Sequence, residues 1–363
     1  MYQRERGRRH TAVALIAFAC AFLISPSAFA AATSARPALG ALAPGSSECL
    51  ANKAAGTVHF ASPFGYDASA GIIDVYAAVK LGYFADLCLN VDFVDAPIGE
   101  AAALVSAGSA QVTGEGSAAD TLDAEANGSD FVGISTYGDT SDYALLTRKG
   151  ITKLTQLEGK VLGYHPAFPV VLKEMLVKAG VDLSKVHMVV DPSYNPLLLV
   201  QGTFSAIQAY QSNEPITLRA AHASFTMWTP GELGVSGTFN VQVVNRKFLA
   251  AHPTATADFL RAEFHAFGYC VKNPATCVGY LAKAQGPTFG VAHGEAEWAI
   301  ESALAIDHHV RGAGIGVETA SEWAPEAKAL VQYKLVAKMP DLPATENTAL
   351  AASLYHGTQL IWP

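Results

Sequence analysis

Short apolar runs alternate with segments of helical periodicity from about residue 57 onward. The runs are rich in β-branched residues and are bounded by glycine, proline and small polar residues, which is typical of strands joined by turns. The first predicted strands are 57–60, 91–94, 110–113, 131–135 and 143–147, with helices at 70–81, 100–107 and 118–126. Strands that alternate with helices in this way predict a parallel sheet with helical crossovers.

The same pattern restarts near residue 161 and then gives way to helices. The predicted elements are strands at 161–164, 186–190, 206–210 and 224–228, helices at 168–179, 196–202 and 215–221, a strand at 240–244, and helices at 246–251, 254–271, 275–284 and 294–306. Pro253 and Pro274 stand where two of these helices begin, a position that proline favours.

Two successive α/β units followed by a return in helices predict two lobes. We expect lobe 1 to contain residues 57–145 and 236–363 and lobe 2 to contain residues 146–235, with hinges near 143–149 and 231–237. Each lobe should hold a mixed, mostly parallel sheet flanked by helices. A ligand should lie in the cleft between the lobes, because the carboxyl ends of such strands form binding sites. The pattern alone leaves a single-lobed enzyme of the same α/β class open.

The first thirty residues have the pattern of an export signal. Residues 1–30 contain a basic start, an apolar run of roughly 15 residues and an Ala-x-Ala cleavage site that ends at Ala30. Such a run is too short to span a membrane as a helix. Cleavage would leave a mature N-terminal segment, 31–56, on a periplasmic protein. A lipid anchor at Cys20 is a less favoured alternative, and twin-arginine export stays open.

Composition and charge limit the kind of protein and the partners that we expect. Half of the 363 residues are hydrophobic and 15% are charged, so the chain can bury a core and is not a disordered polymer. The formal net charge is −8, and no basic run interleaved with aromatic residues follows the signal. Nucleic acid is therefore excluded as an expected partner, and we expect a monomer.

The four cysteines that follow the signal favour disulfides. An even number of cysteines in an exported chain is typical of disulfide pairing, and three connectivities are possible. We favour Cys49–Cys88, which would hold the N-terminal segment, and Cys270–Cys277, which would close a short loop. Four buried thiols are the alternative. No Cys/His spacing is typical of a zinc site.

Catalytic motifs are missing from the sequence. It contains neither a phosphate-binding Gly-x-x-x-x-Gly-Lys-Ser/Thr loop nor a Gly-x-Ser-x-Gly nucleophile turn. His308 and His309 are adjacent, so on a helix their side chains point about 100° apart and make a poor metal site. We therefore expect no catalytic residue, no metal and no cofactor.

Polar and aromatic residues gather instead near the ends of predicted strands. The segment 62–71 combines aromatic residues with turn formers, and 114–118 opens a helix whose free amides can bind a polar group. Glycine-rich turns with serine caps are also ordinary structure, which is the alternative. The candidate ligand-binding residues are Phe64, Tyr66, Ser69, Gly116, Ser117, Tyr137, His165, Tyr210, Asn213, Glu214 and Trp228.

The segment 209–215 is the sharpest of these signals. It places Tyr210, Asn213 and Glu214 at a strand end, and Pro215 fixes the first helical turn. Glu214 is then the N-cap candidate, so its carboxylate either caps the helix only or contacts a ligand.

Several short segments, in order along most of the chain, have the sequence pattern of a known protein family. They are 76–84, 101–110, 154–163, the Asn213-Glu214-Pro215 triplet, 244–249, 252–253 and the helix 259–270. With these segments the chain resembles the periplasmic solute-binding proteins of ABC importers in the sulfonate/taurine and thiamine-pyrimidine precursor group. The resemblance implies a type II periplasmic-binding-protein fold that closes on a small molecule and delivers it to an ABC permease and its ATPase in the inner membrane.

The resemblance also implies a binding mode. In the pyrimidine-binding members the glutamate of the triplet binds an aminopyrimidine edge and aromatic residues of the first loop stack on the ring. Carried over, Glu214 would bind the donor groups, Phe64 or Tyr66 would cover the ring, and Ser117 and His165 would complete the pocket. The first loop here reads Ser-Pro-Phe-Gly-Tyr-Asp-Ala-Ser rather than the family's aromatic and Asn-x-Asn-His pattern, so another ligand stays open.

We therefore expect an extracytoplasmic binder of a small nitrogen heterocycle, without enzymatic activity. Glu214 and several aromatic residues with few basic ones favour an amine-bearing ligand over an anion. A sulfonate, taurine or another small anion is the alternative, with Arg148 and Arg219 as the nearby cations. A thiamine-pyrimidine synthase-like enzyme, whose cysteine-rich motif has no counterpart here, and a ligand sensor are alternatives of another class.

Overall fold

The computed structural model describes residues 40–363, which fall within one compact unit. The predicted signal segment 1–30, with Cys20 and Ala30, lies outside these residues. Of the helices between residues 40 and 363, none combines the length and the apolar character needed to cross a membrane.

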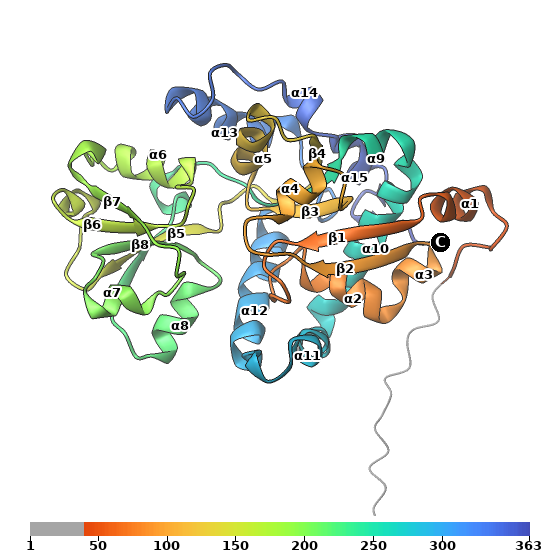
Figure 1. Cartoon of the computed structure of the whole chain (residues 1–363), viewed down its shortest axis with the longest axis horizontal. Helices are drawn as coiled ribbons and strands as arrows, with labels where there is room; N and C mark the ends of the chain where they lie inside the picture. The colour runs from red at the N-terminus through yellow and green to blue at the C-terminus, as the bar shows by residue number, and fades with distance from the viewer. Residues whose placement is uncertain (1–39) are drawn as a thin grey trace, which may run out of the picture. The chain divides into compact units, whose positions relative to one another are not determined.

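The first sheet combines parallel and antiparallel strands (Figure 1). Its strands are β1 (Thr57–Ser62), β2 (Asn90–Asp95), β3 (Val112–Glu115), β4 (Phe131–Gly138) and β10 (Phe239–Asn245). Their order is β2-β1-β3-β10-β4, with β1 parallel to β2 and β3, and β10 antiparallel to β3 and β4. Every residue of β4 is buried, because the apolar faces on both sides of the sheet are covered.

The second sheet repeats this arrangement. Its strands are β5 (Tyr143–Arg148), β6 (Val161–Tyr164), β7 (His187–Val190), β8 (Ala206–Tyr210) and β9 (Phe225–Trp228). Their order is β7-β6-β8-β5-β9, with β6 parallel to β7 and β8, and β5 antiparallel to β8 and β9. The expectation of mixed, mostly parallel sheets flanked by helices is confirmed.

In each sheet the antiparallel strand is the one that has just arrived from the other sheet. The chain passes from β4 to β5 through residues 139–142 and returns from β9 to β10 through residues 229–238. The first connection comes before the predicted hinge at 143–149, because those residues continue as β5 and pair with β8 and β9. The sheets are thus joined at two places.

Helices cover both faces of the first sheet. Val58 and Phe60 of β1 pack on one face and Ala61 packs on the other, as the alternation of a strand requires. The helices on the first face are α1 (Ser47–Ala54), α2 (Ile73–Leu81), α3 (Tyr83–Asp86), α9 (Arg246–Ala251), α10 (Pro253–Lys272), α11 (Pro274–Gln285), α12 (Val291–His308) and α15 (Thr348–Ala352). Helices α10 and α11 begin at the two prolines, as predicted.

The opposite face and the second sheet have smaller cores. On the opposite face lie α4 (Ala101–Ser106), α5 (Ala118–Ala126), α13 (Ala320–Gln332) and α14 (Leu342–Thr345), and on the second sheet α6 (Val170–Lys178), α7 (Leu197–Gln201) and α8 (Glu214–Ala220). Short 3-10 turns occupy 154–157, 183–185, 231–233 and 286–288, and a hairpin of β11 (Tyr355–His356) and β12 (Gln359–Leu360) lies near the C-terminus.

The C-terminal segment completes the core of the first sheet and also contacts helix α6, which covers the second sheet. Trp323 of α13 is fully buried and lies against β4, where a Cβ on Gly133 would come within 2.5 Å of its ring. At the end of the same helix, the Tyr333 carbonyl accepts a hydrogen bond from Lys173 of α6 at 3.4 Å. Helix α13 therefore packs on α5 beside the first sheet and on α6 beside the second.

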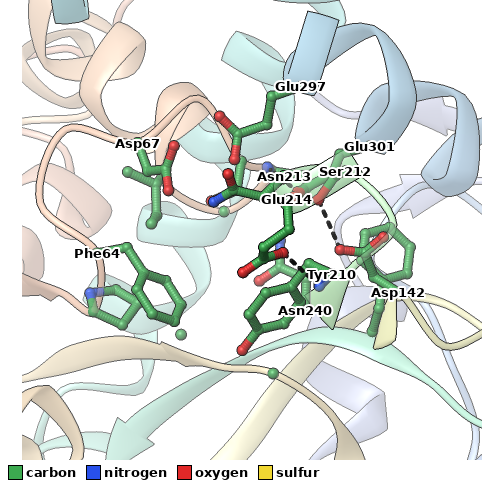
Figure 2. A pocket seen from close by; sticks show the side chains of 18 of the residues that line it. Phe64, Asp67, Asp142, Tyr210, Ser212, Asn213, Glu214, Asn240, Glu297 and Glu301 are labelled. Atoms are coloured by element: carbon green, nitrogen blue, oxygen red, sulfur yellow. Dashed lines mark hydrogen bonds between the residues drawn. The ribbon is translucent and has the colours of Figure 1, made fainter. Parts of the chain in front are cut away.

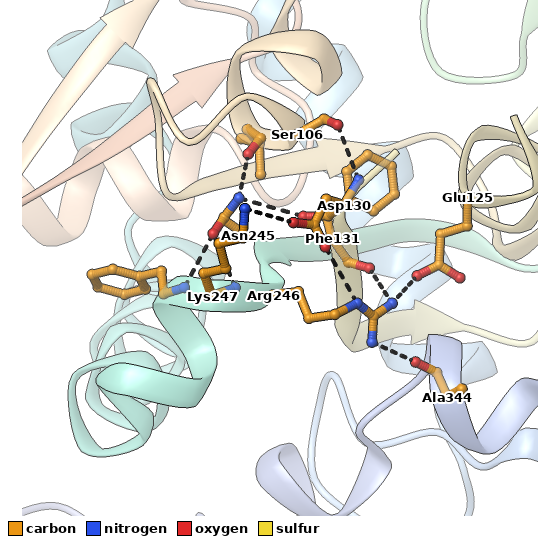
Figure 3. A network of polar contacts seen from close by, with 10 residues as sticks. Ser106, Glu125, Asp130, Phe131, Asn245, Arg246, Lys247 and Ala344 are labelled. Atoms are coloured by element: carbon orange, nitrogen blue, oxygen red, sulfur yellow. Dashed lines mark hydrogen bonds and ion pairs between the residues drawn. The ribbon is translucent and has the colours of Figure 1, made fainter. Parts of the chain in front are cut away.

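A polar network holds the end of β10, where the chain re-enters the first sheet (Figure 3). Asn245 caps α9 by accepting from the N–H groups of Lys247 and Phe248. Arg246 donates to Glu125 at 2.7 Å and to the Ala344 carbonyl at 2.9 Å. The network joins β10 to α5 and to the C-terminal segment.

Both predicted disulfides are present. Cys49–Cys88 ties α1 to the turn before β2, and Cys270–Cys277 joins α10 to α11 across the turn at Asn273. The first bond spans 39 residues of sequence and the second spans 7.

The two disulfides should differ in their effect on stability, because the entropy that a crosslink removes from the unfolded chain grows with the length of its loop. Replacing Cys49 and Cys88 together by serine should lower the free energy of unfolding by about 4 kcal/mol, against about 2 kcal/mol for Cys270 and Cys277. Urea unfolding of both double variants under oxidising conditions measures this. A larger loss for the Cys270 and Cys277 variant would contradict it.

Candidate functional site

A cavity of about 280 Å³ lies where the loops after β1, β3 and β8 meet. These loops follow the carboxyl ends of parallel strands in both sheets, where α/β folds bind ligands. Asp142 from the first connection, Tyr194 from the loop after β7, Asn240 at the start of β10, and Glu297 and Glu301 of α12 complete the wall. Figure 2 shows side chains from these elements turned toward a common space, which we name the cleft.

The cleft is lined with carboxyl groups. They belong to Asp67, Glu115, Asp142, Glu214, Glu297 and Glu301. Among the cleft-lining residues of the described chain there is no lysine, arginine or histidine. An anionic ligand would find no charged partner there, whereas an amine or amidine would find acceptors with which it forms strong charge-assisted hydrogen bonds. The cleft is therefore suited to a cation or to a ligand rich in N–H groups.

Glu214 lies at the centre of the cleft, and it does not cap a helix (Figure 2). Its Oε2 accepts a hydrogen bond from the Tyr210 N–H at 2.8 Å, and its side chain is buried. Helix α8 begins at Glu214 itself, with Asn213 at the N-cap position and Pro215 second in the helix. The assignment of Glu214 as N-cap is thus wrong, because its carboxylate turns back to the end of β8 rather than toward the helix amides.

His165 lies behind Glu214 rather than in the cleft. Its ring stacks on Tyr194 with centroids 3.8 Å apart, and its Nδ1 lies 3.4 Å from the Asp191 carbonyl oxygen. Its Nε2 lies 3.9 Å from Glu214 Oε1, beside a void of about 10 Å³, the size of one water molecule. His165 can therefore act on a ligand only through the position of Glu214.

Ser212 connects the two sides of the cleft. Its hydroxyl lies 2.8 Å from Asp142 Oδ2 and 2.9 Å from Glu301 Oε1, and Glu301 also accepts from the Ala70 N–H at 2.6 Å. A hydroxyl has one hydrogen to donate. Both contacts can be hydrogen bonds only if one of the two carboxyl groups carries a proton.

Asp67 and Glu297 form a second carboxyl pair. The two side chains share a hydrogen bond, and Asp67 Oδ1 also accepts from the Ala68 N–H at 2.9 Å. Glu297 is only 2% exposed, and its Oε2 has no hydrogen-bond partner among the described residues. This buried acceptor lies on the cleft wall, and no donor from residues 40–363 reaches it.

Aromatic rings provide apolar surface on both sides of the cleft. Phe64, in the loop after β1, is 38% exposed and meets Tyr210 edge to face with centroids 6.1 Å apart. Tyr210 is itself stacked on Tyr143 at 5.0 Å. These rings give a planar ligand a face to contact beside Glu214.

Six of the predicted ligand-binding residues line the cleft. They are Phe64, Ser69, Gly116, Tyr210, Asn213 and Glu214. Gly116 is required for close packing, since a Cβ there would stand 2.6 Å from the hydroxyl oxygen of Tyr143.

Tyr66 and Ser117 are near the cleft without lining it. Tyr66 stacks on Phe93 at 5.3 Å and lines an adjoining cavity. Ser117 is the N-cap of α5 and accepts from the Asp120 N–H.

Tyr137 and Trp228 are placed in the hydrophobic cores. The Tyr137 hydroxyl lies 2.5 Å from Asp74 and 2.8 Å from Glu263 in the core of the first sheet. Trp228 of β9 donates from its indole nitrogen to Thr147 at 3.0 Å.

The prediction missed the acidic wall supplied by α12. Glu297 and Glu301 are four residues apart, so they share one face of the helix. Like charges at this spacing destabilise an isolated helix, and Trp298 between them is fully buried. Two glutamates at this spacing beside a buried tryptophan could therefore have indicated a binding site from the sequence, because an acidic pair on an inward helix face is unfavourable unless a positively charged or N–H-donating group binds it.

Burial changes the ionisation of the cleft. Burial, with the negative charge of Asp120 adding to it, raises the pKa of Glu115 to about 8. Burial also raises the pKa of Asp142, Glu297 and Glu301, and neighbouring carboxyl groups raise each further. These side chains hold protons near neutral pH until a positive charge approaches.

Within residues 40–363, no group of three or more His, Cys, Asp or Glu side chains has the arrangement of a metal site.

A family model described as NMT1/THI5 like matches residues 69–277, more than half of the chain. The matched region contains Glu214 and ends before Glu297 and Glu301. No curated protein matches the sequence.

Solved structures share the fold at low sequence identity. The alkanesulfonate-binding protein SsuA of Xanthomonas axonopodis pv. citri, bound to MOPS, is 14% identical, and the match covers 80% of this chain and 98% of that one with a TM-score of 0.59. The periplasmic aliphatic sulphonate binding protein SsuA of Escherichia coli is 15% identical, with coverages of 85% and 94% and a TM-score of 0.58. The CA3427 gene product of Candida albicans, described as having the generic periplasmic binding protein fold, is 15% identical, with coverages of 85% and 98% and a TM-score of 0.56. The predicted periplasmic-binding-protein fold is confirmed.

The raised pKa values predict that the ligand-free protein loses stability as the pH rises. A carboxyl group whose pKa is higher in the folded than in the unfolded state stabilises the fold below its ordinary pKa, and this contribution is lost as the pH rises through the folded value. For Glu115 that window runs from about 4.5 to about 8. The melting temperature should fall by about 4 °C or more between pH 5 and pH 9.

Scanning calorimetry across this range, with Asp142→Asn as the comparison, separates the cleft from general charge repulsion. The variant has one fewer buried carboxyl group and should show a shallower fall. A melting temperature that stays constant or rises toward pH 9 would contradict the assignment.

Proposed function

Because this chain belongs to the NMT1/THI5-like family, we propose that it is the extracytoplasmic solute-binding component of an ABC import system. Its ligand is a small, amine-bearing nitrogen heterocycle, captured when the two lobes close and delivered to a permease served by an ATPase. The observation that carries this proposal is the cleft lined with six carboxyl residues and no basic side chain.

The charge of the cleft favours this ligand over a sulfonate. A sulfonate binds through arginine, lysine or clustered backbone N–H groups. Here it would face the Glu214 carboxylate and five further carboxyl residues, and no basic side chain. Two of the matched structures are sulfonate-binding proteins by name, but at 14% and 15% identity that name describes those proteins.

The geometry supports a specific mode of recognition. Glu214 has one oxygen bound to the Tyr210 N–H, which fixes the carboxylate in place, and it is free to accept from an amino group or a protonated ring nitrogen of the ligand. Phe64 and Tyr210 offer apolar surface to the ring. The hydrogen bond from Ser212 to Glu301 joins loop 211–213, which follows β8 of the second sheet, to α12 beside the first sheet. Such a bond across the cleft is what two lobes closed on a ligand require.

Two further features support binding outside the cytoplasm rather than catalysis within it. Disulfides persist in oxidising compartments such as the periplasm, and all four described cysteines are paired. A thiolate nucleophile or an imidazole base would have to lie in the cleft, and neither cysteine nor histidine is among its lining residues in the described chain.

Binding should depend on the negative charge of Glu214. The probes are 4-aminopyrimidine and its hydroxymethyl derivatives, tested beside ethanesulfonate and taurine by calorimetry on the purified protein. Glu214→Gln should weaken binding of the aminopyrimidines roughly ten- to a hundredfold, since a hydrogen bond to a charged acceptor is lost.

Glu232→Gln is the matched control. Glu232 lies on the same lobe, is exposed, and bonds only to its own turn through the Thr229 N–H, so affinity should not change. Binding of sulfonates in place of aminopyrimidines would overturn the ligand class. An unchanged affinity in Glu214→Gln with a large loss of stability would assign Glu214 a structural role.

A further inference from the structure

A second cavity of about 390 Å³ adjoins the cleft. The two share Phe64, Asp67 and Glu297 in their walls, so these residues mark the boundary between them. The rest of the second cavity is formed by the loop after β1 and by the start of α12, namely Tyr66, Gln285, Thr288, Phe289, Gly290, His293 and Gly294. We name it the side chamber.

One oxygen of the carboxyl pair at this boundary has no donor among the described residues. Asp67 and Glu297 share one hydrogen bond, and the Oε2 of Glu297 is buried without a partner in the described chain. A buried acceptor left unpaired costs stability, and Asp67 beside it raises the pKa of Glu297 further and so opposes its ionisation. Backbone and hydroxyl donors satisfy Glu301, one turn further along α12, but none reaches this oxygen.

The pair is distinct from the site at Glu214. Glu214 is held by the Tyr210 N–H on the side of the second sheet and adjoins the void at His165. Asp67 and Glu297 belong to the first loop and to α12, and they face the side chamber as well as the cleft. Figure 2 shows Glu297 and Asp67 as separate side chains above Glu214 in that view. The cavity system thus presents two acidic positions to one ligand.

A contact across the two sides encloses this second position. His293 Nε2, in the wall of the side chamber, lies 3.0 Å from Asn213 Oδ1, in the residue before Glu214. The hydrogen bond joins the start of α12 to the loop that carries Glu214. A ligand that reaches Asp67 and Glu297 would therefore be covered when this contact forms, which strengthens its charge interactions by excluding water.

We propose that the ligand is a two-headed cation: a heterocyclic ring whose amino edge binds Glu214, bearing a protonated aminoalkyl group that binds between Asp67 and Glu297 at the mouth of the side chamber. This rests on the proposed function of the cleft as a binder of nitrogen heterocycles. The ammonium supplies the N–H donor that Glu297 Oε2 lacks and a positive charge that favours the ionised form of Glu297. The side chamber leaves room for a further substituent.

A matched pair of probes tests the second position. The first is 4-aminopyrimidine with a 5-aminomethyl group, and the second carries a 5-hydroxymethyl group, so they have the same ring and nearly the same size but differ in charge. Titration calorimetry on the wild-type protein at pH 7 should give an affinity roughly ten- to a hundredfold higher for the aminomethyl compound.

Variants on α12 test whether the preference for the aminomethyl compound depends on Glu297. Glu297→Gln should remove most of the difference between the two probes while leaving the affinity for the hydroxymethyl compound within about threefold. Glu295→Gln makes the same chemical change at an exposed position two residues away on the same helix and should retain the full preference. Asp67→Asn is a second variant of the pair, in case Glu297→Gln does not fold, and should act in the same direction.

The outcomes separate this inference from the proposed function. If both probes bind equally well to the wild type, the second cation position is wrong and the heterocycle binder stands. If the aminomethyl compound is preferred equally by wild type, Glu297→Gln and Asp67→Asn, the ammonium binds elsewhere and the inference fails. If neither probe binds while an anion does, both proposals are overturned.

Discussion

The burial of carboxyl groups without a cation beside them is the constraint on which the cleft depends. A carboxylate that loses its hydration is costly, so its pKa rises and the group keeps its proton. The chain moderates the cost at Glu301 with the Ala70 N–H and the Ser212 hydroxyl, and at Asp142 with the same hydroxyl. Glu115, Asp142, Glu297 and Glu301 are therefore held in their protonated forms, and they become charged when a positive ligand displaces the protons. Ligand binding and ionisation of the site become one process.

The exchange of strands between the sheets explains how these groups come together. Each sheet accepts one antiparallel strand from the other, β5 in the second and β10 in the first. The parallel strands β1, β3 and β8 then end in loops at one cavity. Asp142 lies on the connection that enters β5, and Asn240 lies at the start of β10. The first connection between the sheets and the strand that follows the second are therefore also part of the cleft wall, which links the geometry of the site to the relative position of the sheets.

Local sequence patterns are sufficient to predict the helices and strands, because the preferences that form these elements act over a few neighbouring residues. Runs of β-branched residues locate strands of both sheets, and Pro253 and Pro274 locate the starts of two helices. Positions that depend on packing are harder to predict. The side chains of Tyr137 and Trp228 leave the cleft because a strand alternates faces with every residue, and the sequence near a strand end does not determine which face is buried. Glu297 joins the cleft only because α12, far along the chain from β8, packs across it.

Helix α13 has a mechanical consequence. Two bodies joined by two flexible connections can rotate about the line that passes through them. The contact from Lys173 to the Tyr333 carbonyl adds a non-covalent attachment between helices of the two sheets, away from the cleft contacts of Ser212 and Asn213. Glu326 of the same helix holds the second connection by accepting from the Thr238 hydroxyl at 2.6 Å. A rotation of one sheet against the other would therefore also slide or break a contact remote from the cleft, so the energy of such a rotation depends partly on residues outside the cleft wall.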